Sequence, residues 1–239
     1  MPNFKLSYKT FGENAILIEW PSEISEIILN DILDFKNKID NELDLKDCIV
    51  GYNSILLVYR FILQNSDFKI EFLKELYHQK SIEKNQKITH WKIPVCYDLS
   101  FGIDLEDISK TIKISPKEII QLHTKAIYTV YFIGFLPGFL YLGGLDDQIA
   151  IPRKATPRLK VAKGAVAIGG NQTGIYPNES SGGWNIIGNS PISFFDVKNQ
   201  HPCFAKTGDK ITFEPISLEE YTNIKNQAES NAYQIKMIE

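Results

Sequence analysis

Two of the chain's three arginines, Arg153 and Arg158, lie in the stretch Ile-Pro-Arg-Lys-Ala-Thr-Pro-Arg, each directly after a proline. Proline fixes its own φ and pushes the preceding residue into extended geometry, so each Pro-Arg pair is expected to form a stiff elbow. A guanidinium meets a carboxylate or phosphate with two parallel hydrogen bonds, which a lysine ammonium does not. We therefore predict that Arg153 and Arg158 are catalytic residues that bind an anionic ligand. The structural alternative is an ion pair with an acid of the same region, such as Asp146, Asp147 or Asp196.

A glycine-rich turn follows, in the sequence Gly-Gly-Asn-Gln-Thr-Gly-Ile-Tyr-Pro from residue 169. Exposed backbone N–H groups in such a turn can hold an anion or an amide. The candidate ligand contacts here are Gly169, Gly170, Gln172, Thr173 and Tyr176. Tight turns of a small barrel are the structural alternative. The chain has no Walker A sequence, so any ATP must be held by another geometry or by another subunit.

Aromatic residues and the turn residues beside them supply the remaining candidate contacts: Phe135, Pro137, Gly138, Tyr141, Gly183 and Trp184. Ordinary core packing is the alternative for the aromatic rings. His123, near the end of an expected helix, is a candidate general base, although a lone histidine is more often a surface or capping residue. The chain has no HExxH, nucleophile-elbow or paired metal-ligand sequence, so we predict no metal site.

The composition excludes several classes of protein. A net charge of −3 over 239 residues gives no basic surface for nucleic acid. We expect no secretory signal, and because no apolar run reaches about 20 residues, we also expect no membrane contact. Its three cysteines are widely spaced and form no CxxC pair, which favours reduced thiols and a cytoplasmic location.

A polar segment at residues 81–90 predicts a domain boundary, which we place between residues 84 and 85. Domain 1–84 is expected to be a small α+β unit. Its predicted strands and helices cover residues 5–8, 15–20, 22–43, 48–61 and 67–80. We find no candidate for chemistry in this unit.

Domain 85–239 is expected to begin with a strand, two helices and a strand, at residues 90–98, 104–112, 115–126 and 127–135. Eleven of the 15 glycines then fall between residues 134 and 188, among short apolar runs. This spacing predicts a β-barrel or sandwich. A helix capped by Ser217 is expected over residues 217–230, followed by a frayed end. These residues predict a small anionic or amide ligand, without specifying a reaction.

The order of these motifs resembles one known family. The run from Val130 to Pro191 joins Pro-Gly-Phe-Leu-Tyr-Leu-Gly-Gly-Leu-Asp, the two Pro-Arg elbows, the glycine-rich turn and Gly-Gly-Trp. It is similar to the family of 5-oxoprolinase subunit PxpB, which also includes the kinase inhibitor KipI and subunit 1 of allophanate hydrolase. The similarity extends over nearly the whole chain. It implies an α+β fold, with a small N-terminal α+β domain and a C-terminal cyclophilin-like β-barrel.

The resemblance also implies a function and partners. It suggests a non-autonomous subunit of an ATP-hydrolysing enzyme that opens 5-oxo-L-proline to L-glutamate. A second cyclophilin-like subunit (PxpC-like) and a third subunit (PxpA-like) would complete the enzyme. ATP would be shared with or supplied by these partners, and no biotin is implied. The alternative is a binding protein that inhibits autophosphorylation of a sensor histidine kinase. Prolyl isomerase activity or a role with urea or allophanate has less support, because fold analogy alone does not establish function.

The chain departs from the usual family sequence at four places. Ser100 replaces a glutamate before Phe-Gly, and Asn189 replaces an arginine after Gly188. Val-Pro-Ala-Gly becomes Val-Ala-Lys-Gly at residues 161–164, and Ser181 replaces a proline before Gly-Gly-Trp. The first two changes remove a polar group and an anion contact. The turn glycines and the elbows remain, so we expect the fold to be unaffected.

Overall fold

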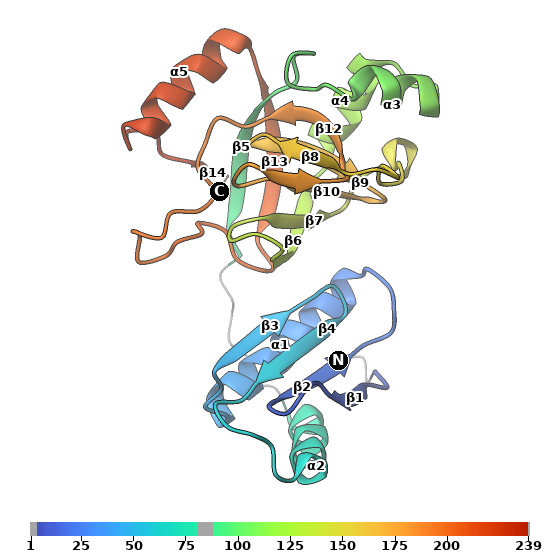
Figure 1. Ribbon diagram of the computed structural model, residues 1–239, viewed down its shortest axis with the longest axis vertical. Coiled ribbons are helices and arrows are strands. Elements are labelled where there is room, and N and C mark those ends of the chain that lie inside the picture. Colours follow the sequence, from blue (N-terminus) through green and yellow to red (C-terminus); the bar gives the residue numbers. More distant parts are fainter. Residues whose placement is uncertain (1–3, 81–87, 239) are drawn as a thin grey trace. The chain divides into compact units, whose positions relative to one another are not determined.

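The computed structural model describes residues 4–80 and 88–238, and the chain divides into two compact units, residues 1–87 and 88–239 (Figure 1). The predicted boundary between residues 84 and 85 lies outside the described residues. Within them, no helix is both long and apolar enough to cross a bilayer.

The N-terminal unit is an antiparallel sheet with two helices, as the sequence predicts. The sheet has the strand order β1-β2-β4-β3. Alternate residues of the two inner strands, such as Ile16 and Ile18, are fully buried. Ser25 caps the first helix, which contributes Ile32 and Phe35 to the same core. The elements are β1 (Ser7–Thr10), β2 (Ala15–Glu19), α1 (Glu26–Glu42), β3 (Asp47–Val50), β4 (Ser54–Val58) and α2 (Ser66–His78).

The C-terminal unit is a closed barrel, which confirms the predicted fold class. Hydrogen-bonded neighbours run β12-β9-β10-β7-β6-β13-β5, and β12 also pairs with β5 through Asn189 and Cys96, which closes the ring. Strands β5 and β13 are parallel, whereas the other neighbours are antiparallel. These strands are β5 (His90–Cys96), β6 (Tyr128–Ile133), β7 (Leu140–Gly143), β9 (Ala165–Gly169), β10 (Gln172–Ile175), β12 (Asn185–Asn189) and β13 (Lys210–Ile216).

Three α-helices and a short ribbon accompany the barrel. Pro116 begins α4 (Pro116–Lys125) and Ser115 caps it, whereas α3 is Leu105–Ile112. Ser217 and Glu220 form a two-way capping box at the start of α5 (Leu218–Glu229). Strands β8 (Arg158–Val161) and β11 (Ser180–Gly182) pair as a separate ribbon, and η1 (Asp147–Ile149) is a single 3₁₀ turn. The expectation of a frayed end was wrong in part, because β14 (Lys236–Ile238) pairs with β5.

The barrel strands bury residues on both faces. Along β9, Val166 and Ile168 belong to the main core, whereas Ala165 and Ala167 belong to a second, smaller cluster. Because successive residues of a strand point to opposite faces, the second cluster lies on the outer face of the barrel. This outer face holds most of the predicted ligand contacts.

Candidate functional site

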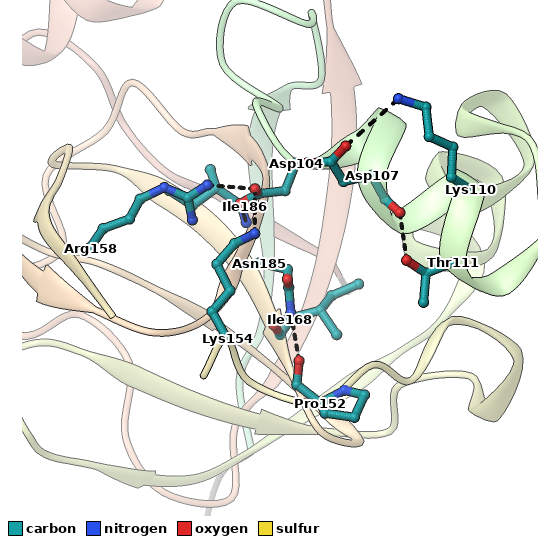
Figure 2. Close-up of polar contacts among 10 residues, drawn as sticks. All are labelled: Asp104, Asp107, Lys110, Thr111, Pro152, Lys154, Arg158, Ile168, Asn185 and Ile186. Atoms are coloured by element: carbon teal, nitrogen blue, oxygen red, sulfur yellow. Dashed lines mark hydrogen bonds and ion pairs between the residues drawn. The ribbon is translucent and has the colours of Figure 1, made fainter. Parts of the chain in front are cut away.

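The first Pro-Arg elbow is fixed to the end of the β9–β10 hairpin. Ile151 and Gly170 exchange two backbone hydrogen bonds, with N–O distances of 3.1 and 2.7 Å. The side-chain amide of Asn185 donates to the carbonyl oxygen of Pro152 at 3.0 Å and to that of Ile168 at 3.2 Å (Figure 2). The backbone that carries Arg153 is therefore held by β9, β10 and β12 together.

The second elbow is held by the segment around the predicted Gly-Gly-Trp turn. The N–H of Lys154 donates to the carbonyl oxygen of Gly183 at 2.7 Å. Arg158 begins β8 and lies opposite Gly182 of β11. A Cβ on Gly183 would lie 3.5 Å from the Lys154 carbonyl oxygen, an ordinary contact. The two elbows are thus rigid, but they direct their arginines to different places.

Arg158 points to Asp104, at the start of α3, as Figure 2 shows. Its Nη2 lies 2.5 Å from Asp104 Oδ1, and Lys154 Nζ lies 2.9 Å from the same oxygen. The other carboxylate oxygen accepts the backbone N–H of Ile186 at 2.7 Å. Asp104 is 1% exposed, so one buried carboxylate joins α3, β12 and the elbow segment.

The environment of Asp104 keeps it ionised. Burial alone raises the pKa of a carboxyl group, but here the hydrogen bonds from Arg158, Lys154 and Ile186 outweigh burial. The net result is a lowered pKa for Asp104. Arg158 still keeps one buried group, Nη1, without a hydrogen-bond partner. Arg158 therefore forms the ion pair that the sequence analysis gave as the structural alternative. Its partner is Asp104, and not Asp146, Asp147 or Asp196.

Arg153 has a different environment, because its guanidinium carbon lies 5.3 Å from the ring centre of Trp184. This distance is typical of a cation–π contact. The side chain is exposed, so the guanidinium has its hydrogen-bonding edge available to a ligand. Of the two predicted arginines, Arg153 is the one placed to meet an anion from outside.

The aromatic candidates gather beside Arg153 on the outer face of the barrel. Tyr141 lies 5.7 Å from Trp184 and 4.6 Å from Phe139, measured between ring centres. Phe139 also meets the edges of Tyr176 and Trp184 at 5.0 and 5.8 Å. Burial raises the pKa of both tyrosines, so their hydroxyls stay protonated at neutral pH. Tyr141 is only partly buried, whereas the other rings are nearly covered.

Two glycines make room for these rings. A Cβ on Gly169 would lie 2.5 Å from Trp184 Cδ2, and one on Gly174 would lie 2.9 Å from Phe139. Neither distance is found for real Cβ atoms, so any larger residue would displace a ring. The glycines of β9 and β10 therefore serve the packing of the aromatic cluster. By contrast, a Cβ on Gly170 would meet open space.

The β6–β7 turn contributes Phe135, Pro137 and Gly138. Phe135 is 61% exposed and has a φ of 65°, a conformation that a bulky residue seldom adopts. Its ring meets Phe139 edge-on at 5.7 Å. Gly138 has a φ of 85°, and a Cβ there would lie 2.7 Å from Phe195 Cβ. This turn holds an exposed aromatic ring at the margin of the cluster.

His123 and Thr173 lie inside the barrel and not on this face. His123 is fully buried, with Nδ1 2.8 Å from the Tyr97 hydroxyl and Nε2 2.9 Å from Thr173 Oγ1. Thr173 in turn donates to the carbonyl oxygen of Ala167 at 3.0 Å. Burial lowers the pKa of His123 to about 3, so its ring is neutral at pH 7. This geometry suits a buried bridge between α4, β10 and Tyr97, the residue that follows β5.

Gln172 lies on β10 next to Thr173. Because neighbouring strand residues face opposite ways, its side chain belongs to the outer face. Its Oε1 is buried and has no hydrogen-bond partner. Among residues 4–80 and 88–238, no group of three acidic, histidine or cysteine side chains is arranged to hold a metal ion.

These features define a two-unit protein whose C-terminal cyclophilin-like barrel carries an arginine beside an aromatic cluster. Residues 6–205 match the family model of the carboxyltransferase domain, subdomain C and D. The B subunit of 5-oxoprolinase from Bacillus subtilis is 34% identical over 232 residues, 91% of this chain and 95% of that protein. The B subunit of the Haemophilus influenzae 5-oxoprolinase is 37% identical over 204 residues, 84% and 94% of the two chains. The chain therefore belongs to the family that includes this carboxyltransferase-domain model and these B subunits of 5-oxoprolinase.

A solved structure supports the fold independently. The urea amidolyase of Kluyveromyces lactis superposes with a TM-score of 0.84 over 98% of this chain and 16% of that one. At 19% identity, this likeness concerns the fold alone.

Two residues of the site, Asp104 and Lys154, were not among the predicted ones. Their roles depend on contacts between segments about 50 residues apart, and no local sequence signal marks them.

Proposed function

We propose that this chain is the B subunit of an ATP-dependent 5-oxoprolinase complex that converts 5-oxo-L-proline to L-glutamate. The observation that carries the proposal is the identity of 34 and 37% with proteins named as the B subunit of 5-oxoprolinase, over most of both chains. These names denote one subunit of a larger assembly, so the chain alone is expected to be inactive. The names of these relatives favour the enzyme over the kinase inhibitor.

The chemistry that we propose begins with a lactam, which is a stable amide. ATP would phosphorylate the amide oxygen with release of ADP, and addition of water to the activated carbon would then break the C–N bond and release phosphate. Arg153 is our candidate for binding the substrate carboxylate or the anionic intermediate, because its guanidinium is exposed and rests on Trp184. Tyr141 and Trp184 would form the apolar wall beside it.

We propose no phosphate-binding role for the glycine-rich turn. Its Gly170 N–H already donates to the carbonyl oxygen of Ile151 at 2.7 Å. Thr173, which belongs to the same sequence and lies on β10, points into the barrel. We therefore propose that the nucleotide is held mainly by the partner subunits, a second cyclophilin-like subunit and a third subunit.

Arg158 and His123 have supporting parts in this proposal. Asp104 forms ion pairs with both Arg158 and Lys154, and these pairs hold the elbow segment in place. His123 holds Thr173, and thereby the part of β10 that lies behind Gln172. Arg158 and His123 are therefore positioning residues, because they hold other residues of the barrel in place and do not contact the ligand in this proposal.

The test is reconstitution. The chain is co-expressed with the products of its flanking genes, and ATP-dependent release of glutamate from 5-oxoproline is measured with the chain present and absent. We expect activity only when the chain is present. A complex that assembles fully but releases no glutamate would refute the assignment. Activity that is unchanged without the chain would also refute it.

A further inference from the structure

Arg153 is held by the residues around Trp184 through more than its own side chain. Its guanidinium carbon lies 5.3 Å from the ring centre of Trp184. On the carboxyl-terminal side of Arg153, the N–H of Lys154 donates to the carbonyl oxygen of Gly183 at 2.7 Å. The peptide bond that follows Arg153 is therefore tied to the residue before Trp184.

The peptide bond that precedes Arg153 is tied to the residue after Trp184. This residue is Asn185, the first of β12, and its side-chain amide donates to the carbonyl oxygen of Pro152 at 3.0 Å (Figure 2). That carbonyl belongs to the same peptide bond as the N–H of Arg153. Because the ring of Pro152 also fixes its own φ, the bond from Asn185 leaves the backbone little freedom just before Arg153.

Asn185 is itself held in one orientation. It is 5% exposed, and its amide also donates to the carbonyl oxygen of Ile168, its partner on β9, at 3.2 Å. Only the nitrogen of an asparagine amide can donate, so two carbonyl acceptors determine which end of the amide faces them. Among residues of similar size, aspartate would place an acceptor against these carbonyls, and leucine would supply no donor.

We propose that Asn185 is a positioning residue that sets the place of Arg153 for binding an anion. Its bond to Pro152 orients the elbow, and Trp184, its neighbour in the chain, supports the guanidinium. The planar fork of Arg153 is thus preorganised, with its hydrogen-bonding edge left for the ligand. Asn185 is buried and does not contact the ligand. This inference rests on the function proposed above for Arg153.

The first measurement uses the full chain without ATP or partner subunits. Phenylglyoxal modifies arginine side chains, and peptide mass spectrometry gives the rate of modification at Arg153. The exposed Arg60, in the N-terminal unit, is the internal reference. Asn185→Ala should raise the rate at Arg153 at least threefold relative to Arg60, because the guanidinium is no longer held against Trp184.

Asn189→Ala is the matched control for the loss of a buried asparagine. Asn189 ends the same strand, is 4% exposed, and donates from its amide to the carbonyl oxygen of Lys163 at 2.9 Å. Its replacement removes a similar bond from β12, but the rate at Arg153 should stay within twofold of wild type. Asn185→Ser, which keeps one donor, is the second variant if Asn185→Ala does not fold, and it should raise the rate at Arg153 as well.

The second measurement uses the reconstituted complex and shows whether Asn185 acts through Arg153. Asn185→Ala should lower kcat/KM for 5-oxoproline at least fivefold. In complexes that already carry Arg153→Lys, the same substitution should lower kcat/KM less than twofold, because the residue through which Asn185 acts has been replaced.

Three results would overturn the proposal. The first is an unchanged rate of modification of Arg153 in both Asn185 variants. The second is an equal rise in Asn189→Ala, which would show a general loosening of β12. The third is an undiminished effect of Asn185→Ala in the Arg153→Lys complexes. A complex that assembles but does not use 5-oxoproline would refute the proposed function alone, and the modification rates of the isolated chain would still decide the role of Asn185.

Discussion

Asp104→Asn tests how much the barrel depends on a single carboxylate. The substitution keeps an oxygen for the Ile186 N–H but removes the charge that faces Arg158 and Lys154. Breaking a buried ion pair costs about 3–5 kcal/mol. The two cations are 28 and 26% exposed, so water relieves part of the cost. We expect the free energy of unfolding of the barrel unit to fall by about 2–4 kcal/mol at pH 7.

The expected loss depends on pH in a defined direction. The pKa of Asp104 is lower in the folded chain than in the unfolded chain, where it is about 3.9. The stabilisation is therefore fully present above pH 4 to 5 and is lost as pH falls through the folded pKa. The difference between wild type and Asp104→Asn should consequently shrink in acid.

The assay is urea unfolding, monitored by hydrogen exchange of peptides from α3 and β12. These peptides report on the barrel unit separately from the N-terminal unit. Asp107→Asn is the matched control, since Asp107 lies on the same helix and reaches Lys110 only at 3.8 Å, with both side chains exposed (Figure 2). Its expected effect is below about 0.5 kcal/mol. Adding Arg158→Gln to Asp104→Asn should cost less than the sum of the two, by at least about 1 kcal/mol. An Asp104→Asn effect as small as that of Asp107→Asn would show that the ion pairs of Asp104 do not stabilise the barrel.

Three further predictions concern the barrel interior and its outer face. Burial lowers the pKa of His123 to about 3, whereas an unfolded histidine has a pKa of about 6.5. The free energy of unfolding of the barrel should therefore fall as pH drops below 6.5, by up to about 1.4 kcal/mol per pH unit. His123→Gln should flatten this slope in urea midpoints measured from pH 7 to 4, and an unchanged slope would contradict the assignment. Gly169→Ala should displace Trp184, lower stability by about 1–3 kcal/mol and shift tryptophan emission to the red. Gly170→Ala, which meets open space at a φ of 69°, should cost only about 1 kcal/mol and leave the emission unchanged; equal emission shifts would argue against the packing role of Gly169.

Local patterns were sufficient to predict most of the fold. The helices expected over residues 22–43, 115–126 and 217–230 correspond to α1, α4 and α5, and Ser217 caps α5 as expected. These signals act within a few residues of one another, so they can be read from one segment. The barrel type itself came from the order of the motifs and their resemblance to a family.

The contacts of the site could not be predicted in this way. Asp104 and Asp107 have similar local sequences, and only the fold brings Arg158, 54 residues away, to one of them. His123 looks like a surface or catalytic residue in the sequence, yet it lies where α4 meets the barrel interior. The glycine-rich turn predicts an anion or amide site, and only the structure shows that Gly169 and Gly174 also leave room for aromatic rings. Each of these roles depends on contacts made across the barrel.

We propose that Arg153, beside the aromatic cluster on the outer face of the barrel, binds an anion in the reaction of the assembled complex. The most direct measurement is kcat and KM for 5-oxoproline in complexes that carry Arg153→Lys or, as a matched control, Arg60→Lys. Arg60 is an exposed arginine of the N-terminal unit that pairs with Asp44 at 3.3 Å. Lysine keeps the charge but lacks the planar fork, so we expect kcat/KM to fall at least tenfold for Arg153→Lys alone. Wild-type kcat/KM in the Arg153→Lys complex would contradict the account.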